Sequence, residues 1–226
     1  MTTIVLSGSL GSTAEMWEPQ RPVLADVRVV ALEHPGHGPA PVVKVATVAD
    51  LAARALAQID DERFSFVGLS LGGAVGMQIA LDAPERVEKL VLAATSMRFG
   101  DPQQWRERAA TVRAQGLEAI VDATMGRWFT QPADDRWRSM FLSVDREGYA
   151  RCCEALAAWD VREAVSRIDV PTLAIAGRED PTTPPEHLHA LADAIPGARL
   201  EVVEGAAHLV NVDRADAFNE LLEVWL

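Results

Sequence analysis

Short apolar runs alternate along this chain with stretches of helical periodicity. The runs lie at 4–7, 28–33, 64–68, 89–94, 172–176 and 200–204, and a polar or glycine-rich turn follows each. Their β-branched and aliphatic residues are typical of strands that are buried on both faces. Strands that alternate with helices form a parallel sheet covered by helices. The pattern therefore predicts an α/β fold, with helices at 48–58, 71–82, 185–194 and 215–224.

The segment 97–167 breaks this alternation. It contains amphipathic patterns at 101–116, 117–129, 133–144 and 147–159, and no convincing strand. We expect this segment to form a helical lid that is inserted over the open end of the sheet. The core would then comprise residues 1–96 and 168–226, because one domain with an insertion fits a chain of 226 residues.

The charge balance limits the partners that this chain can bind. Its 21 basic and 33 acidic side chains give a net charge of -12. Nucleic acids and anionic membranes require clustered basic surface, so we expect neither partner and favour a small molecule. The amino terminus lacks the features of a secretory signal, and no apolar run is long enough to span a bilayer, which favours a cytoplasmic protein. The adjacent Cys152 and Cys153 are expected to be reduced thiols.

A serine flanked by glycines follows the strand predicted at 64–68. Gly68, Ser70 and Gly72 match the pattern G-x-S-x-G, and the helix predicted from residue 71 follows directly. A turn of this kind exposes its serine as a nucleophile at the carboxyl end of a strand. A Cβ atom at either glycine would clash where the chain folds back on itself. We therefore predict that Ser70 is a catalytic nucleophile.

A serine hydroxyl needs a base to take its proton and an acid to orient that base. His208 follows the last predicted strand, and Asp180 follows the strand before it. Loops after parallel strands open on the same edge of a sheet, so both residues are expected on the same face as Ser70. The order Ser, Asp, His is that of the α/β-hydrolases. Glu179, the neighbour of Asp180, is the alternative acid.

The negative charge on an attacked carbonyl oxygen needs two N–H donors, which form an oxyanion hole. The backbone N–H of Leu71 directly follows the nucleophile. The loop 7–12, SGSLGS, follows the first predicted strand, and its Leu10 N–H is the expected second donor. A flexible linker is the alternative interpretation, but the loop is short for a linker and directly follows the strand.

No cofactor or metal is expected. His34 and His37 supply two imidazoles without a nearby cysteine, which is a poor metal site, so a structural role in a tight turn is favoured. The sequence also lacks a phosphate-cradling glycine loop, which argues against a nucleotide.

Several stretches together resemble the α/β-hydrolases, and more narrowly the 3-oxoadipate enol-lactonases of aromatic catabolism. They cover most of the chain and lie at 9–20 (SLGSTAEMWEPQ), 36–38 (GHG), 66–96 (beginning FVGLSLGGAV), 127–130 (RWFT), 148–162 (GYARCCEALAAWDVR), 168–187 (beginning IDVPTLAIAGRED) and 205–214 (GAAHLVNVDR).

The resemblance implies that Ser70, Asp180 and His208 form a catalytic triad and that the N–H groups of Leu10 and Leu71 form the oxyanion hole. It also implies a lid that shapes a small polar pocket. The activity that it implies is the hydrolysis of a small ester or lactone through an acyl-enzyme, with 3-oxoadipate enol-lactone as the first candidate substrate.

An enol-lactone of this type carries a free carboxylate, so a strongly acidic protein must place a cation in its pocket. Arg127 is the candidate cation, and the neighbouring Trp128 is the candidate apolar wall. In the alternative interpretation, Trp128 packs the lid onto the core and Arg127 lies on the surface.

The chain departs from the enol-lactonase pattern in two places. The usual amino-terminal pair of strands is absent, so the sheet starts with a strand that relatives cover, and such an exposed edge invites pairing into a homodimer. The turn at 33–41, EHPGHGPAP, differs from the family's D-R-G-H-G-x-S. A general carboxylesterase for small esters is therefore the second hypothesis, and a ligand receptor with this fold is the third.

Overall fold

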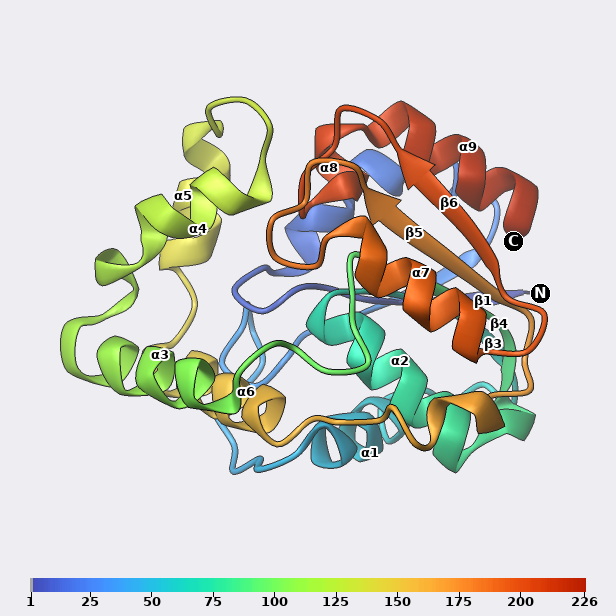
Figure 1. The fold of residues 1–226 in the computed structure, drawn as a ribbon, viewed down its shortest axis with the longest axis horizontal. Coiled ribbons are helices and arrows are strands. Elements are labelled where there is room, and N and C mark those ends of the chain that lie inside the picture. The colour runs from blue at the N-terminus through green and yellow to red at the C-terminus, as the bar shows by residue number, and fades with distance from the viewer. Residues whose placement is uncertain (1) are drawn as a thin grey trace.

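The computed structural model describes residues 2–226, in which a six-stranded parallel sheet is covered by helices on both faces (Figure 1). The strand order is β2-β1-β3-β4-β5-β6, and every neighbouring pair is parallel. The α/β fold predicted from the sequence is confirmed, and each predicted strand is present. The strands are β1 (Thr3–Ser7), β2 (Arg28–Leu32), β3 (Phe64–Leu69), β4 (Val87–Ala93), β5 (Thr172–Gly177) and β6 (Arg199–Val203).

Helices cover the two faces of this sheet. Figure 1 shows α9 on one face and α1 and α2 on the opposite face. The N-terminus of α1 has a reciprocal cap, in which Thr47 Oγ1 accepts from the Asp50 N–H and the Asp50 carboxylate accepts from the Thr47 N–H. The helices outside 97–167 are α1 (Val48–Leu56), α2 (Leu71–Asp82), α7 (Pro185–Ala194), α8 (Val210–Asp213) and α9 (Ala215–Trp225).

Burial differs between the central and the outer strands. β1, β3 and β5 are buried along their whole length, as their apolar sequences predict. The same expectation is wrong for the two outer strands, because only Leu32 of β2 and only Val203 of β6 are fully buried. β2 is an outer strand, because β1 lies between it and β3, so the expectation that the first strand of the chain forms the exposed edge is wrong. The open edge on this side is therefore β2, and the homodimer expected from such an edge stays a prediction that would use β2.

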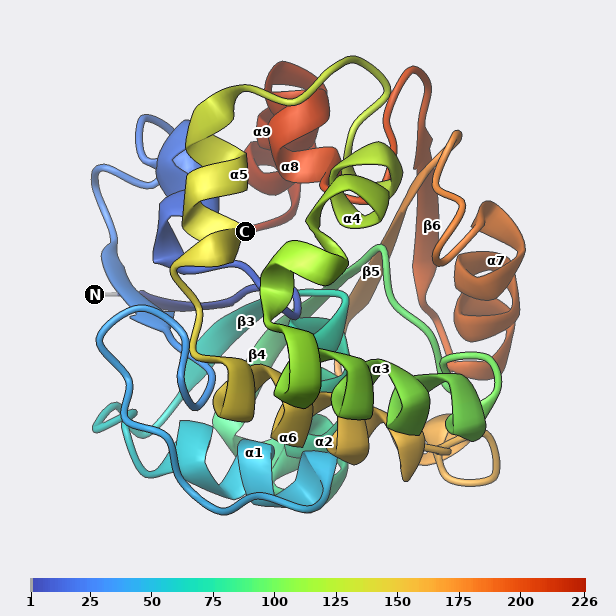
Figure 2. The ribbon, with the colours of Figure 1, turned by 90° about the vertical axis from the view of Figure 1, so that its left-hand side faces the viewer.

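Residues 97–167, hereafter the lid segment, contain helices and no strand, as their sequence patterns predict. The helices are α3 (Pro102–Gln115), α4 (Val121–Trp128), α5 (Asp135–Leu142) and α6 (Arg146–Ala157). β5 and β6 point toward these helices, so the lid segment lies over the carboxyl ends of the strands (Figures 1 and 2). The division into a core and an inserted lid stays an interpretation of this arrangement.

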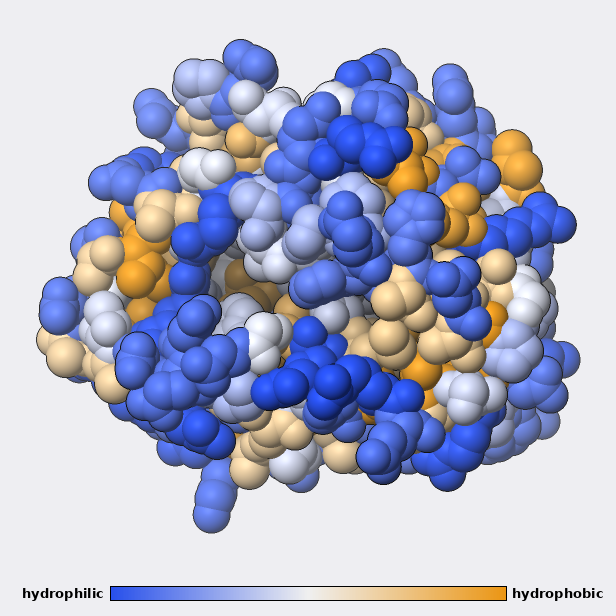
Figure 3. Space-filling model, in the orientation of Figure 1, coloured by the Kyte–Doolittle hydropathy of each residue, from blue (hydrophilic) through white to orange (hydrophobic). Residues whose placement is uncertain are grey.

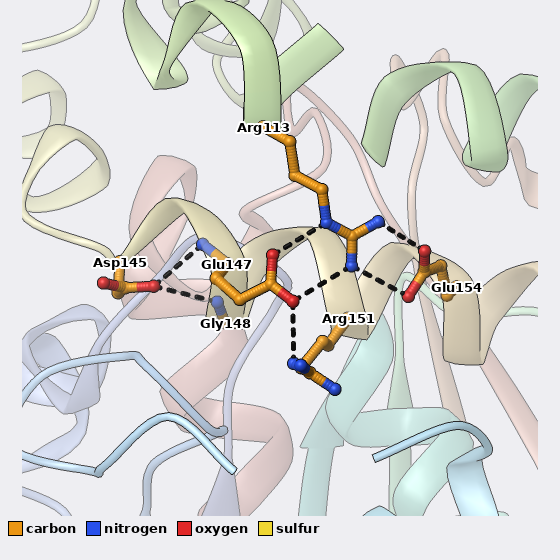
Figure 4. A network of polar contacts seen from close by, with 6 residues as sticks. All are labelled: Arg113, Asp145, Glu147, Gly148, Arg151 and Glu154. Atoms are coloured by element: carbon orange, nitrogen blue, oxygen red, sulfur yellow. Dashed lines mark hydrogen bonds and ion pairs between the residues drawn. The ribbon is translucent and has the colours of Figure 1, made fainter. Parts of the chain in front are cut away.

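Ion pairs hold α3 and α6 of the lid segment together. The Arg113 guanidinium on α3 lies between the carboxylates of Glu147 and Glu154 on α6, with Nε 2.7 Å from Glu147 Oε2 (Figure 4). Arg151 also pairs with Glu147 at 2.9 Å. The positive charge of Arg113 is thus neutralised within the lid segment. Among residues 2–226, no helix is long and apolar enough to cross a membrane.

Candidate active site

Ser70 lies in a sharp turn between β3 and α2. Its backbone has φ 58° and ψ -112°, a region that L-residues avoid and that costs about 1–3 kcal/mol. Two neighbouring hydrogen bonds hold this conformation: the Ser70 N–H donates to the Ala93 carbonyl at 2.9 Å, and Thr95 Oγ1 donates to the Ser70 carbonyl at 2.8 Å. The strain is therefore maintained by contacts with the end of β4.

The two glycines of the pattern are required by close backbone contacts. A Cβ atom on Gly68 would overlap the backbone of Gly72, and one on Gly72 would overlap the Ser7 carbonyl at the end of β1. The Gly72 N–H donates to the Gly8 carbonyl at 3.0 Å, which joins the start of α2 to the loop after β1. The sequence-based prediction that a Cβ would clash at both positions is confirmed.

Asp180 and His208 are in direct contact, as their positions after β5 and β6 predict. His208 Nδ1 lies 2.8 Å from Asp180 Oδ2, and the two residues are 4% and 2% exposed. The carboxylate holds the proton on Nδ1, which leaves Nε2 free to act as a base. Glu179, the alternative acid, is exposed, and its N–H donates to the Ala206 carbonyl at 2.9 Å. The geometry therefore favours Asp180 as the acid.

Several donors keep the Asp180 carboxylate ionised. Burial favours a higher pKa, but the electrostatic interaction and hydrogen bond with His208 and the bonds from Thr183 and Thr182 hold the pKa of Asp180 below its ordinary value. Thr183 Oγ1 donates at 2.7 Å to the same oxygen that binds His208. The N–H groups of Thr182 and Thr183 donate to the other oxygen at 2.7 and 3.1 Å. The carboxylate is fixed in place through both of its oxygens.

The side chain of Ser70 lies at the same edge of the sheet and is 5% exposed. Within residues 2–226, its hydroxyl has no hydrogen bond to His208. Hydrogen bonds between a nucleophile and its base are often long before substrate binds. The structure thus brings Asp180 and His208 into contact and places Ser70 in the strained turn at the same edge.

The N–H groups expected to form an oxyanion hole are free in the described part of the chain. Neither Leu10 nor Leu71 donates its backbone N–H to a protein acceptor. Leu71 is the first residue of α2, where the N–H groups have no partner within the helix and the helix dipole favours negative charge. The loop that carries Leu10 is fixed to the start of α2 by the Gly72 to Gly8 hydrogen bond.

His34 and His37 brace both ends of this loop. His34 Nε2 lies 2.9 Å from the Gly8 carbonyl, to which it donates, and His37 Nε2 accepts from the Gly11 N–H at 3.0 Å. His37 Nδ1 lies 3.0 Å from the Pro35 carbonyl, so both of its ring nitrogens are occupied. Burial lowers the pKa of both histidines, that of His37 to about 3. The two imidazoles are neutral structural groups, as the favoured interpretation of the sequence predicts.

The lid segment is attached to the loop that carries His208. The His208 N–H donates to the Arg127 carbonyl at 3.4 Å, and the Leu209 N–H donates to the Trp128 carbonyl at 3.0 Å. Asp213 strengthens this attachment, because its Oδ2 accepts from the N–H groups of Ala207 at 2.8 Å and of Thr130 at 3.0 Å. The position of His208 is therefore coupled to the lid segment.

Arg127 and Trp128 occupy different surroundings. Arg127 lines a cavity of about 310 Å³ that lies between the lid segment and the loop after β5. The surface is hollowed between these two parts of the molecule (Figure 3). Trp128 is 3% exposed and packs edge-on against Phe141 at 5.6 Å, inside the lid segment. Trp128 does not line this cavity, and its role as a pocket wall stays a prediction.

Thr183 and Asp213 were not identified from the sequence. Thr183 lies three residues after Asp180 in Asp-Pro-Thr-Thr, a pattern in which an aspartate accepts from the next residues of a turn, and this signal could have indicated it. Asp213 contacts Thr130, which is 83 residues away along the chain, and no local pattern indicates such a contact.

Comparison with known proteins agrees with this geometry. Residues 4–221 match the model of the alpha/beta hydrolase family. The chain is 36% identical to 3-oxoadipate enol-lactonase 2 of Acinetobacter baylyi, over 97% of this chain and 86% of that protein. It is 30% identical to a protein of Rhizobium rhizogenes described as a carbamate hydrolase, RutD, over 96% of this chain and 89% of that protein. The crystal structure of the enol-lactonase from Burkholderia xenovorans LB400 superimposes with a TM-score of 0.94 at 37% identity, over 99% of this chain and 90% of that chain. The chain therefore belongs to the alpha/beta hydrolase family of enzymes.

Proposed function

We propose that this protein hydrolyses a small carboxylic ester or lactone through an acyl-enzyme on Ser70, and that 3-oxoadipate enol-lactone is its substrate. One observation is the main support for hydrolysis through an acyl-enzyme. A serine in a strained turn follows β3, and a buried, hydrogen-bonded Asp180–His208 pair follows β5 and β6 at the same edge of the sheet. Strained residues of this kind cluster at active sites, so the strain at Ser70 supports a catalytic role.

In the proposed first step, Ser70 Oγ attacks the ring carbonyl of the lactone and His208 Nε2 takes the hydroxyl proton. Asp180 stabilises the imidazolium that forms. The negative charge on the carbonyl oxygen is accepted by the N–H groups of Leu10 and Leu71, and each such donor contributes about 3 kcal/mol to the stability of the transition state.

The ring then opens as its C–O bond breaks. The departing enol oxygen takes the proton from His208 and the enol becomes a ketone, so the leaving group is a good one. The acyl group remains on Ser70. In the second half, His208 takes a proton from water, the hydroxide attacks the acyl carbonyl, and Ser70 leaves with the proton from His208. One lactone and one water give one 3-oxo dicarboxylic acid.

Two relatives support the substrate. The Acinetobacter and Burkholderia proteins that are similar over nearly the whole chain are both named as enol-lactonases. The relative described as a carbamate hydrolase supports a second candidate substrate, a carbamate. A general carboxylesterase is the third candidate for the same triad.

A panel of three substrates distinguishes these candidates. We expect kcat/KM of the wild-type protein for freshly generated 3-oxoadipate enol-lactone to exceed that for 4-nitrophenyl acetate and for an alkyl carbamate by about 100-fold or more, because a site built to bind a polar group discriminates against substrates that lack it. Higher kcat/KM for the aryl ester would favour a general esterase. Tight lactone binding without turnover would favour a receptor.

A further inference from the structure

Two arginines of the lid segment lack the carboxylate partners that neutralise many other arginines of this chain. Within residues 2–226, ion pairs of 4.0 Å or less include arginines 28, 63, 113, 136, 138, 151, 162 and 178, but neither Arg108 nor Arg127. Arg113, on the same helix as Arg108, lies between two glutamates (Figure 4). Arg108 and Arg127 differ from the other arginines without an ion pair in that both donate to the same Thr124 hydroxyl, which places two cations side by side.

Both arginines line the cavity of about 310 Å³ described above. Its volume is in the range of small-molecule sites. Its other walls include Trp105 and Phe99, which pack edge-on with ring centroids 6.3 Å apart. Thr182 also lines it, and this residue donates its N–H to the Asp180 carboxylate. The cavity therefore adjoins the loop that carries the catalytic acid.

The guanidinium groups are held in place by neutral oxygen atoms. Arg108 Nε donates to the Tyr149 hydroxyl at 2.7 Å, and its Nη2 donates to Thr124 Oγ1 at 2.9 Å. Arg127 Nη2 reaches the same Thr124 Oγ1 at 3.4 Å. The Thr124 hydroxyl donates its own proton to the Ile120 carbonyl at 2.8 Å, so it orients the cations without neutralising them.

This arrangement is electrostatically unfavourable on its own. Burial lowers the pKa of Arg127, and the positive charge of Arg108 lowers it further. In the described part of the chain, Arg108 Nη1 donates no hydrogen bond. Thr182 Oγ1 is buried and also has no partner among these residues. An anion in the cavity would offset the repulsion between the two guanidinium groups and accept hydrogen bonds from these donors. A carboxylate suits this role, because its two oxygens match the planar N–H groups of an arginine.

We propose that Arg108 and Arg127 together form a carboxylate-binding subsite of the active site, in which Arg108 is a further specificity-determining residue. The identification of its ligand as the free carboxylate of the substrate rests on the proposed function. Arg108 and Arg127 bind the carboxylate, Thr124 and Tyr149 orient Arg108, and the wall of Trp105 and Phe99 covers the apolar part of the ligand.

The test is isothermal titration calorimetry with adipate and with adipamide, its uncharged diamide of the same length, at constant ionic strength. We expect adipate to bind the wild type at least tenfold more tightly than adipamide. R108Q and R127Q should each raise the Kd of adipate at least tenfold. R127K keeps the charge and should raise this Kd less than R127Q does. R106Q removes one charge from an exposed position of α3 and should change the Kd of adipate by less than twofold.

Equal binding of adipate and adipamide would overturn the proposal, and so would a loss in R106Q as large as that in R127Q. R127Q removes only one long hydrogen bond within the protein, so it provides the test even where R108Q disturbs the lid segment. Calorimetry needs no turnover. A protein that bound adipate through these arginines but left the lactone unopened would refute the proposed substrate and retain the subsite.

Discussion

The Nε2 atom of His37 accepts a hydrogen bond from the N–H of Gly11 at 3.0 Å. Gly11 directly follows Leu10, whose N–H is proposed to stabilise the oxyanion, and its backbone has φ 89°. A Cβ atom on Gly11 would lie 2.6 Å from the Phe141 ring of the lid segment. The direction of the Leu10 N–H is therefore determined by the neighbouring turn at Gly11. That turn is held by the buried imidazole of His37 and by the lid segment.

His37→Ala should therefore reduce catalysis without changing substrate binding. The substitution leaves the Gly11 N–H without an acceptor in a buried site, which costs about 1–3 kcal/mol of stability. For 4-nitrophenyl acetate we expect kcat to fall about tenfold, which is less than the fall that removal of a whole oxyanion donor causes. KM should stay within about twofold of the wild-type value. Steady-state kinetics checks this. The matched control is His189→Ala on the exposed side of α7, and an equal fall in kcat there would contradict the account.

Stability should fall in mild acid because His34 and His37 are buried and neutral. Burial lowers the pKa of His37 from 6.5 to about 3, so the unfolded chain binds more protons between these values and the free energy of unfolding rises with pH there. The stabilisation that comes from keeping the histidine neutral is complete above pH 6.5 and is lost as the pH falls toward 3. The free energy of unfolding changes by up to about 1.4 kcal/mol per pH unit for each histidine. Urea unfolding at a series of pH values measures the slope, and His37→Gln should reduce it. An unchanged slope in that variant would refute the assignment.

Substitutions of two glycines should have opposite effects. Gly68→Ala places a methyl group against the backbone of Gly72 and Gly73, so we expect a loss of more than about 3 kcal/mol or no folded protein. Gly126 lies in α4, and an added Cβ there meets nothing within 4 Å. Gly126→Ala should raise the free energy of unfolding by about 0.5–1 kcal/mol. Denaturant unfolding of both variants checks the signs. A stable Gly68→Ala protein would show that the turn tolerates a side chain.

Asp213→Ala should detach the lid segment from the loop that carries His208. It removes the acceptor for the N–H groups of Ala207 and Thr130, at an expected cost of about 2–3 kcal/mol. Hydrogen exchange should accelerate at residues 127–130 and 207–209 and remain unchanged in the central strand β3. Glu220→Ala on the exposed side of α9 is the control. Uniform acceleration over the whole chain would indicate global destabilisation and contradict a local role.

The sequence was sufficient for those features that depend on local pattern. Apolar runs predicted all six strands, and the position of Asp180 and His208 after β5 and β6 predicted their contact because parallel strands share an edge. The partial exposure of β2 and β6 was missed, because the order of strands in a sheet does not follow from the order in the chain. The four-residue helix α8 was also missed, because it is too short to show a period.

Contacts between distant segments were not predictable from the sequence. Arg108 and Arg113 lie on the same helix, and only the packing of α3 against α6 shows that Arg113 is neutralised by glutamates and that Arg108 lines a cavity. His34 and His37 were predicted to be structural, but their hydrogen bonds to Gly8 and Gly11 follow from the meeting of two loops.

The central claim is that Ser70 opens the lactone, and the rate of loss of 3-oxoadipate enol-lactone in the wild type and in Ser70→Ala tests it most directly. We predict rapid turnover by the wild type and a kcat at least about 10⁴-fold lower in Ser70→Ala, because a triad without its nucleophile retains only binding and the oxyanion hole. Lactone turnover in Ser70→Ala within about tenfold of the wild type would contradict the acyl-enzyme mechanism.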